Sequence, residues 1–369
     1  MRDELAGELL EELLGWSEDE REARLPRLLA MSRWKWDGYE GFTAGQRLME
    51  SLVRWLQGFE STTERMRWLD FLLDQVIFIS AAELEHAISL VYDDYVRPSV
   101  IRRVSARLDI PSYRTTAISA TPQYRADQRR PLVLGLSDGA RLDLLRRSST
   151  GLSHEQFSLT ADLGFRQVET LVSKLNSALS SWLLDEPRTF SSVLLVDDFY
   201  GSGTSLINIE DADGQKRIGG KVGKFLDSVR GQGLDSPGAE GEPQLLETGY
   251  RGTILLYVAS AQAADYIRRT LATAGLDWEL WVVQRIPHSS VVTDEKLLAD
   301  CEKFWDSVLE DAHKANSARG YKDCALPLVL YHNTPNNSVS PLWADSTGRG
   351  GRDMHALFPR YERHHVDRP

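Results

Sequence analysis

The stretch of the chain that decides its fold is VLLVDDFYGSGTSL, residues 193–206. Its apolar start predicts a strand that is buried on both faces, as in a parallel sheet covered by helices. Two carboxylates, Asp197 and Asp198, end this strand, and a loop of glycines and hydroxyl side chains follows them. We expect the loop to open a helix, where unpaired main-chain amides and the helix dipole favour an anion. The stretch therefore predicts a ligand site at the carboxyl end of a strand in an α/β sheet.

The rest of the chain after about residue 130 repeats this alternation of apolar runs and helical stretches. Such a pattern is typical of an α/β domain with a parallel sheet. The expected strands cover residues 132–136, 193–196, 253–259, 279–284 and 328–331. The expected helices cover residues 163–184, 219–229, 261–273 and 294–314. Glycine and proline predict a mobile insertion over residues 230–243, and we expect the tail of residues 346–369 to be partly disordered.

The first third of the chain has the pattern of helices. Leucines at helical spacing give residues 3–16 an apolar face. Serine and glutamate at capping-box spacing predict further helix starts at Ser17, Ser61 and Ser80. We expect Pro98 to interrupt the last of these helices, because proline disfavours the α conformation of the residue before it. The sequence thus predicts a helical region over residues 1–108 and an α/β domain over residues 109–369.

Composition excludes several classes of protein. The chain has 369 residues, a formal net charge of −11 and two cysteines, so it has no disulfide framework and is not built mainly to hold nucleic acid. Its start lacks the basic and apolar regions of a signal peptide, and we expect a cytoplasmic protein without a membrane span. A small basic cluster is best explained as a solvated helix face; it comprises Lys216, Arg217, Lys221 and Lys224.

The loop after Asp198 has the chemistry of a phosphate site. Gly201 and Gly203 let main-chain amides close round an anion, and neighbouring hydroxyls add donors. Two acids beside such a loop need hydroxyls or a metal to contact, and a ribose 5-phosphate supplies both the phosphate and the hydroxyls. Rival motifs fail, because the chain has no Gly-x-x-x-x-Gly-Lys-Ser/Thr loop, and Tyr200 stands where a nucleophile elbow needs glycine. A tight structural turn with surface acids is the alternative.

A further loop follows the last expected strand. The segment YHNTPNNSVSPLW, residues 331–343, combines amides, which can read a base edge as donors and acceptors, with aromatic rings that can stack on a base. Loops after parallel strands gather at one edge of a sheet, so we expect this loop at the same cleft as Asp197. The candidate base-binding residues are Tyr331, Asn333, Asn336 and Asn337. A structural loop rich in Asx turns is the alternative.

The stretch at 193–206 resembles the phosphoribosyl-pyrophosphate signature of type I phosphoribosyltransferases. This resemblance implies that Asp197 and Asp198 contact the ribose hydroxyls, with any magnesium contact made through water. It implies that the 5-phosphate is held by Gly201, Ser202, Gly203, Thr204 and Ser205. In the segment LVLGLSDGARLDLLRR, residues 132–147, it implies a pyrophosphate loop made by Ser137, Asp138, Gly139 and Ala140, with Arg141 as the catalytic cation.

Residues 55–345 resemble a narrower group, the phosphoribosyltransferase-like effector proteins of bacterial anti-phage systems, some of which accompany retrons. The implied enzyme would use Mg²⁺ to transfer a phosphoribosyl group or to cleave an N-glycosidic bond. The implied ligand is phosphoribosyl pyrophosphate or a nucleotide, and a partner protein or ribonucleoprotein is also implied. A nucleotide sensor, or a scaffold for the helical region, is the alternative; Asp138 and the Gly201-Ser202 pair, where two threonines are usual, favour the sensor. No side chain stands out as general base.

Overall fold

The computed structural model describes residues 3–182, 188–212, 215–236, 244–310 and 316–360. The chain divides into two compact units. Unit 1 combines Met1–Leu84 with Pro287–Pro369, and unit 2 is Glu85–Ile286. This division differs from the expected boundary near residue 108, because unit 2 begins at Glu85 and the segment from Pro287 belongs to the same unit as the N-terminal helices. Within the described ranges, every helix is too short or too polar to cross a lipid bilayer.

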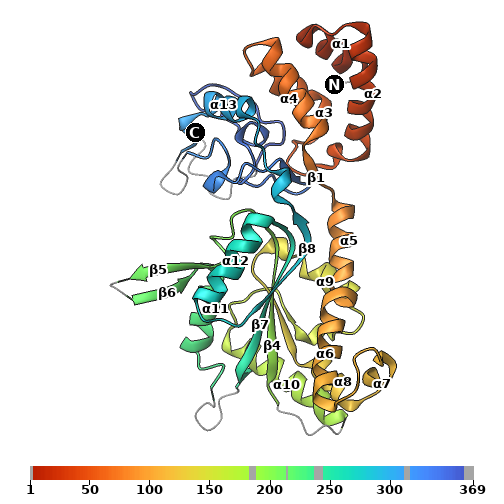
Figure 1. Cartoon of the computed structure of the whole chain (residues 1–369), viewed down its shortest axis with the longest axis vertical. Helices are drawn as coiled ribbons and strands as arrows, with labels where there is room; N and C mark the ends of the chain where they lie inside the picture. The colour runs from red at the N-terminus through yellow and green to blue at the C-terminus, as the bar shows by residue number, and fades with distance from the viewer. Residues whose placement is uncertain (1–2, 183–187, 213–214, 237–243, 311–315, 361–369) are drawn as a thin grey trace. The chain divides into compact units, whose positions relative to one another are not determined.

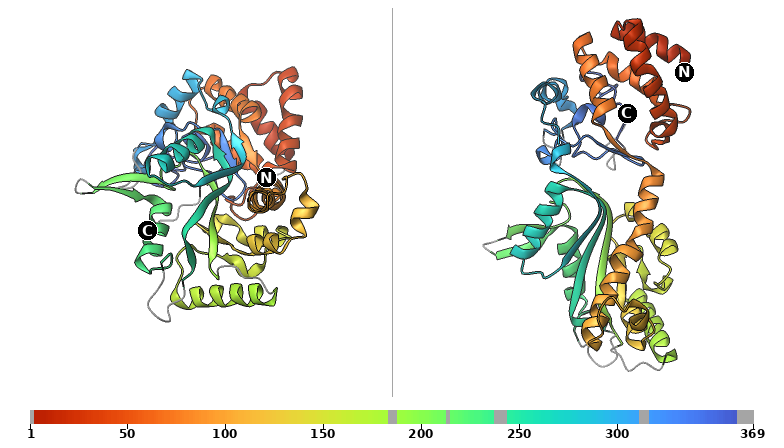
Figure 2. Two further views of the ribbon diagram at one scale, coloured as in Figure 1. Left: turned by 60° about the horizontal axis from the view of Figure 1, so that its bottom comes forward. Right: turned by 45° about the vertical axis from the view of Figure 1, so that its right-hand side comes forward.

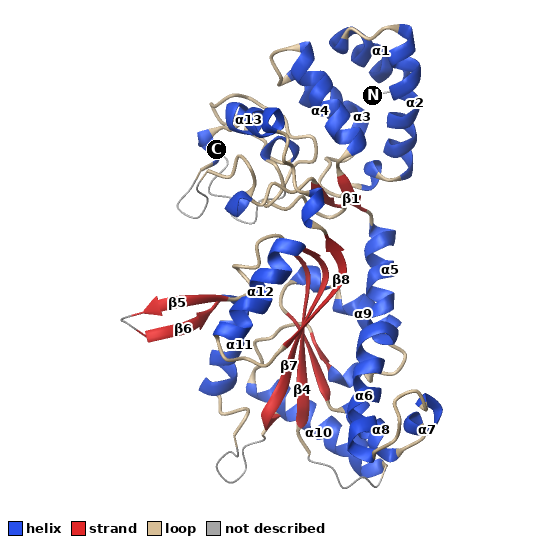
Figure 3. Ribbon diagram, viewed as in Figure 1, coloured by secondary structure: helices blue, strands red, loops and turns tan. Residues whose placement is uncertain are grey.

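Unit 2 contains the parallel sheet. Its strands are β2 (Pro131–Gly135), β3 (Phe157–Ser158), β4 (Phe190–Tyr200), β7 (Leu246–Ser260) and β8 (Glu279–Ile286). They are all parallel and lie in the order β3-β2-β4-β7-β8. Figure 3 labels β4, β7 and β8 of this sheet. The direction of the crossovers therefore reverses between β2 and β4, and the carboxyl ends of these two strands form the usual ligand position of such sheets. The predicted α/β class, with a parallel sheet flanked by helices, is confirmed.

Helices cover both faces of this sheet (Figure 2). One face packs against α10 (Phe165–Ser181), α11 (Gly220–Gly231) and α12 (Ala261–Thr273) through a continuous apolar core. The other face is covered by α5 (Ala81–Val91), a π-helical turn (Tyr92–Val96) and α6 (Arg97–Leu108). The shorter helices of this unit are α7 (Thr115–Ser119), α8 (Pro122–Arg129) and α9 (Leu142–Ser148).

The path from α5 to α6 corrects one expectation. Pro98 does not interrupt the helix, because it lies in the first turn of α6, where a missing N–H removes no helical hydrogen bond. The π-helical turn carries the chain from α5 into α6. The Tyr95 hydroxyl on this turn donates to the Val282 carbonyl of β8 at 2.9 Å, which holds the long helix against the sheet.

A hairpin interrupts the expected helix after the glycine-rich loop. Its strands, β5 (Asn208–Ala212) and β6 (Gln215–Gly219), are antiparallel and extend away from the sheet (Figure 1). The loop forms only one helical turn, in which the amides of Leu206 and Ile207 donate to Gly203. After the hairpin, the amides of Lys221 and Val222 donate to the carbonyls of Ser205 and Leu206, so α11 stacks on that single turn. The expectation that the loop opens a helix directly is therefore wrong, because the hairpin splits this helix.

Unit 1 is mainly helical. Its helices are α1 (Asp3–Leu14), α2 (Glu18–Trp34), α3 (Leu48–Gln57), α4 (Thr62–Asp74) and α13 (Glu295–Phe304). The capping boxes predicted at Ser17 and Ser61 are both present. Residues 346–360 lie against this unit, where Met354 and Phe358 are buried, so this part of the tail is not disordered as expected. The remainder of the expected tail, 361–369, and most of the expected insertion, 237–243, lie outside the described residues.

The last expected strand also belongs to unit 1. Strand β9 (Leu328–Leu330) pairs in parallel with β1 (Ile77–Ile79) in a two-stranded sheet of its own. The expectation that this strand joins the main sheet is therefore wrong. A short apolar run carries no information about its partner, and here the partner lies far away in the sequence.

Candidate functional site

The two carboxylates at the end of β4 lie in different surroundings. Asp197 is 1% exposed, and both of its oxygens accept hydrogen bonds from the protein. Its Oδ2 accepts from the Tyr200 hydroxyl and from the Lys221 ammonium, each at 2.6 Å. Its Oδ1 accepts from the Ser137 hydroxyl and from the Asp198 amide. Asp198 is only half-buried, so it is the acid of the pair that a ligand can reach.

The charge of Asp197 is costly in this position. Burial, and then the neighbouring charge of Asp198, raise the pKa of Asp197, whereas the Lys221 ammonium lowers it. A buried carboxylate that keeps its charge needs such a cation and further donors. Asp197 therefore ties together β4, the turn after β2 and helix α11.

Lys221 links this acid to the glycine-rich loop. Its ammonium contacts Asp197 and lies 5.6 Å from the centre of the Tyr200 ring. Its main-chain amide donates to the Ser205 carbonyl at 3.1 Å. One third of the Lys221 side chain is exposed, so a positive charge stands beside the loop. The expectation of a solvated helix face is wrong for three members of this basic cluster, because Lys216 and Arg217 lie on strand β6 and Lys221 contacts Asp197; Lys224 is exposed on α11 as expected.

The turn after β2, residues 137–141, lies against Asp198. The position that a Cβ atom would take on Gly139 is 2.5 Å from Asp198 Oδ2, so only glycine allows this approach. The fully buried Tyr257 hydroxyl donates to the Ala140 carbonyl at 2.7 Å and fixes the turn from below. The turn expected to hold pyrophosphate and the acid pair are thus neighbours, in keeping with the parallel pairing of β2 and β4.

The same turn carries the amides expected to bind pyrophosphate and Arg141, the expected catalytic cation. Among the described residues, none accepts a hydrogen bond from the main-chain amides of Asp138 and Gly139. Arg141 has a left-handed conformation, with a φ of 42°, and its Nε lies 3.7 Å from Asp143 Oδ1. The turn can therefore offer amides to an anion, but the Asp138 carboxylate would repel an anion that brings no cation with it.

The glycine-rich loop, residues 201–205, follows the acid pair directly. Its start is held by Ser260, whose hydroxyl donates to the Gly201 carbonyl at 2.5 Å. The hydroxyls of Ser202 and Thr204 lie 3.1 Å apart. In the part of the chain that the structure describes, nothing accepts a hydrogen bond from the main-chain amides of residues 202–205. These amides are donors that an anion can use, although the hairpin leaves only one helical turn behind them.

Gly203 was expected to be glycine so that main-chain amides could close round an anion, but the structure gives another reason. Its φ is +80°, a conformation that side chains other than glycine rarely adopt. A Cβ atom here would lie 2.9 Å from Ile267 Cγ1 and 3.2 Å from the Ala263 carbonyl oxygen. The missing side chain thus makes room for α12 and not for a ligand.

The expected base-binding loop lies in unit 1. Its amides serve the structure of that unit, since Asn337 Nδ2 donates to the Tyr321 carbonyl at 3.2 Å and to Cys324 Sγ at 3.3 Å. Tyr331 is buried, and Asn333 and Asn336 are half-buried. These residues lie in a different unit from Asp197, and their role at a base stays a prediction.

The acid pair alone does not form a metal site. Within the described ranges, no three or more histidine, cysteine or acidic side chains are grouped to hold an ion. Asp138 precedes Gly139 in the turn, and Asp198 lies against Gly139. Mg²⁺ commonly binds through one or two carboxylates together with the phosphates of a substrate, so the expected magnesium ion stays a prediction that depends on a bound diphosphate.

Comparison with known proteins places this geometry in a family. No curated protein and no solved structure matches the chain. The model of the PRTase-CE family matches residues 52–360, which include the turn after β2, the acid pair and the glycine-rich loop. The chain therefore belongs to the PRTase-CE family and carries a phosphoribosyltransferase-like domain.

Proposed function

We propose that unit 2 binds a ribose-5-phosphate ligand, either phosphoribosyl pyrophosphate or a nucleotide, at the carboxyl ends of β2 and β4. The observation that carries the proposal is the meeting of three features at this point of the sheet. They are the glycine-rich loop with its available amides, the half-buried Asp198, and the turn at Gly139. A phosphate, a pair of ring hydroxyls and a diphosphate are the groups that these features recognise.

Each part of the site has a role in this proposal. The amides of residues 202–205 and the Ser202 and Thr204 hydroxyls hold the 5-phosphate, with the Lys221 charge beside them. Asp198 accepts hydrogen bonds from the ribose hydroxyls. Asp197 acts as a positioning residue, because its oxygens are already occupied by four protein donors. The proposal therefore assigns Asp197 this positioning role in place of the predicted direct contact with ribose.

The reaction that we propose is phosphoribosyl transfer or cleavage of an N-glycosidic bond. Both pass through a ribose ring with oxocarbenium character, and Asp198 would stabilise this positive charge while it holds the hydroxyls. In phosphoribosyl transfer an acceptor would bond to C1 of the ribose as pyrophosphate leaves it; the amides of the 138–139 turn would receive the pyrophosphate, and Arg141 would add charge. A magnesium ion held by that pyrophosphate and by Asp138 and Asp198 would neutralise it. In cleavage of an N-glycosidic bond, water would bond to C1 and the base would leave instead.

A sensor without catalysis is the second candidate, and two observations favour it. Asp197 is buried and bonded to protein donors, which leaves one acid at the ligand where the resemblance implies two. Asp138 also places a negative charge in the turn that would receive pyrophosphate. In this form the protein would bind a nucleotide and regulate a partner protein or ribonucleoprotein. In either form we propose a role as an effector in bacterial anti-phage defence, of the retron-associated kind.

Calorimetry with phosphoribosyl pyrophosphate and Mg²⁺ tests the site. We expect Asp198→Asn to lose about 1.5–3 kcal/mol of binding free energy, the value of one charge-assisted hydrogen bond. The exposed Asp227→Asn on α11 is the matched control and should bind as the wild type does. Equal affinity in Asp198→Asn and the wild type would refute the site. Release of pyrophosphate by the wild type would identify an enzyme, and binding without release would identify a sensor.

A further inference from the structure

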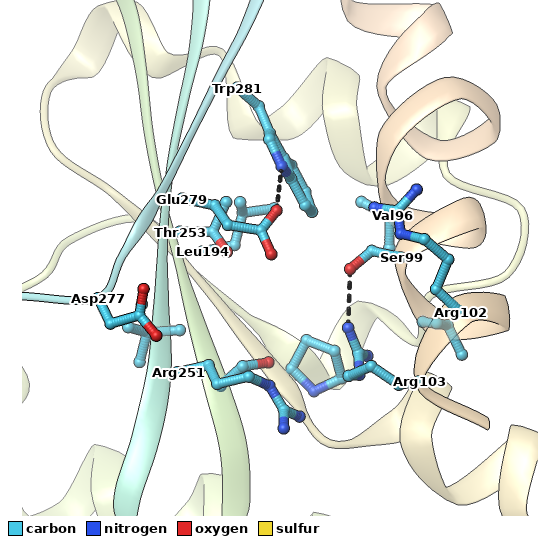
Figure 4. A pocket seen from close by; sticks show the side chains of 15 residues that line it. Val96, Ser99, Arg102, Arg103, Leu194, Arg251, Thr253, Asp277, Glu279 and Trp281 are labelled. Atoms are coloured by element: carbon cyan, nitrogen blue, oxygen red, sulfur yellow. Dashed lines mark hydrogen bonds between the residues drawn. The ribbon is translucent and has the colours of Figure 1, made fainter. Parts of the chain in front are cut away.

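A cavity lies between α6 and the sheet, at the opposite ends of the strands from the acid pair. It is formed inside unit 2 by the beginnings of β4, β7 and β8 and by one side of α6 (Figure 4). Its volume is about 260 Å³. Pockets that hold drug-sized molecules have volumes of roughly 300–1,000 Å³, so this one suits a smaller molecule with part of it at the mouth.

Two arginines face the same space from the two walls. Figure 4 shows Arg103, from α6, hydrogen-bonded to Ser99, and Arg251, from β7, with both guanidinium groups in the same part of the cavity. Burial, and then the charge of Arg251, lower the pKa of Arg103 to about 10. The charges of Asp127 and Glu279 compensate only in part, and although Arg103 Nη1 donates to the Ser99 hydroxyl at 2.9 Å, Arg103 Nε is buried with no hydrogen-bond partner in the described part of the chain. Two cations that lie in one part of a cavity in this way are stabilised by an anion between them.

The sheet side of the cavity also carries an aromatic ring and an acceptor. Trp281 lies on β8 beside the cavity, and its indole N–H donates to Glu279 Oε2 at 2.7 Å. This bond fixes the carboxylate of Glu279, which faces the same space in Figure 4. An indole face suits a planar ring, and a fixed carboxylate suits N–H donors on that ring. The cavity thus combines two cations with a ring surface and an acceptor.

We propose that this cavity is a second ligand site, for a nucleoside monophosphate or a closely similar phosphorylated ring compound. The phosphate, with a charge close to −2 at neutral pH, would lie between Arg103 and the exposed Arg251. The base would lie beside Trp281 and donate hydrogen bonds to Glu279. The site is separate from the one at Asp198, because the two lie at opposite ends of β4, so binding here does not depend on the function proposed above.

Titration calorimetry on the full chain tests the proposal with AMP, GMP, CMP, UMP and inorganic phosphate. We expect at least one nucleotide to bind with a Kd below about 1 mM, and inorganic phosphate to bind at least about tenfold more weakly. Arg251→Gln should weaken the nucleotide by at least about tenfold, since it removes one charged partner of the phosphate. Trp281→Leu should weaken the nucleotide but leave the binding of inorganic phosphate unchanged.

Two further variants make the result specific. Arg166→Gln, an exposed position on α10 at the other face of the sheet, should bind as the wild type does. Asp198→Asn should retain the binding that depends on Arg251. The proposal is overturned if no nucleotide binds, if Arg251→Gln binds as tightly as Arg166→Gln, or if inorganic phosphate binds as tightly as the nucleotides. Loss of the Arg251-dependent binding in Asp198→Asn would also overturn it, because the two sites would then be one.

Discussion

Replacing Lys221 by methionine should destabilise unit 2, because it leaves a buried carboxylate without its cation. Asp197 is 1% exposed and lies 2.6 Å from the Lys221 ammonium. Removing one partner of a buried ion pair typically costs about 3–5 kcal/mol. The Tyr200 and Ser137 hydroxyls still donate to Asp197, so we expect a loss near the lower end, about 3 kcal/mol, in the free energy of unfolding.

The loss should depend on pH in a defined direction. Without Lys221, the pKa of Asp197 in the folded protein rises further, while the unfolded carboxyl keeps its usual pKa near 3.9. The folded state then binds a proton that the unfolded state releases, so stability falls as the pH rises from about 4 toward the raised pKa. The deficit of Lys221→Met should be smaller at about pH 5 than at about pH 8.

Hydrogen exchange during urea unfolding measures this, because peptides from β4 report on unit 2 alone. The exposed Lys224→Met on the same helix is the matched control and should change stability by less than about 0.5 kcal/mol. Adding Asp197→Asn to Lys221→Met should restore about 1 kcal/mol or more, since the uncompensated charge disappears. The reasoning fails if Lys221→Met is as stable as Lys224→Met, or if the double variant is less stable than either single one.

Three further predictions concern other positions. Gly203→Ala should lower the stability of unit 2 by about 1–3 kcal/mol in thermal unfolding, because its φ is positive and the new Cβ atom would contact α12. Gly231→Ala should not lower it, because no atom lies within 4 Å of the Cβ position there. Burial raises the pKa of Tyr39 to about 12, so unit 1 should lose stability as the pH rises from about 10 to 12, and Tyr39→Phe should flatten this dependence in pH-dependent denaturation. Burial raises the pKa of both Cys301 and Cys324, so neither should react with a thiol reagent before unfolding; rapid labelling of either in the native protein would contradict this.

The parts of the fold that the sequence predicts are those set by local patterns. The apolar run at residues 193–196 forms the centre of strand β4, and α12 begins and ends at the expected residues. The hairpin was missed because β5 and β6 are mainly polar and lack the alternation of a half-buried strand. The Asp213-Gly214 pair in the sequence, typical of a hairpin turn, was the available signal.

For the candidate site, the sequence predicted which segments lie close together, and their roles toward a ligand stay predictions. The acid pair and the turn are neighbours because each follows a strand directly and β2 pairs in parallel with β4. Lys221 was not found, because the hairpin separates it from the loop that its amide contacts. Asp197 is buried and Asp198 half-buried because successive side chains on a strand point to opposite faces of the sheet. The sequence alone does not say which face is closed by a helix and a lysine.

The pairing of β1 with β9 sets an order of events during synthesis. Ile77 is made early, and its partner Leu328 is added only after the whole of Glu85–Ile286 has left the ribosome. Unit 2 can therefore complete its sheet before the C-terminal segment that packs with the N-terminal helices has been synthesised. Long-range pairings of this kind form late and leave apolar surface exposed meanwhile. We therefore expect the N-terminal helices to keep apolar surface exposed until the segment around Leu328 has been synthesised.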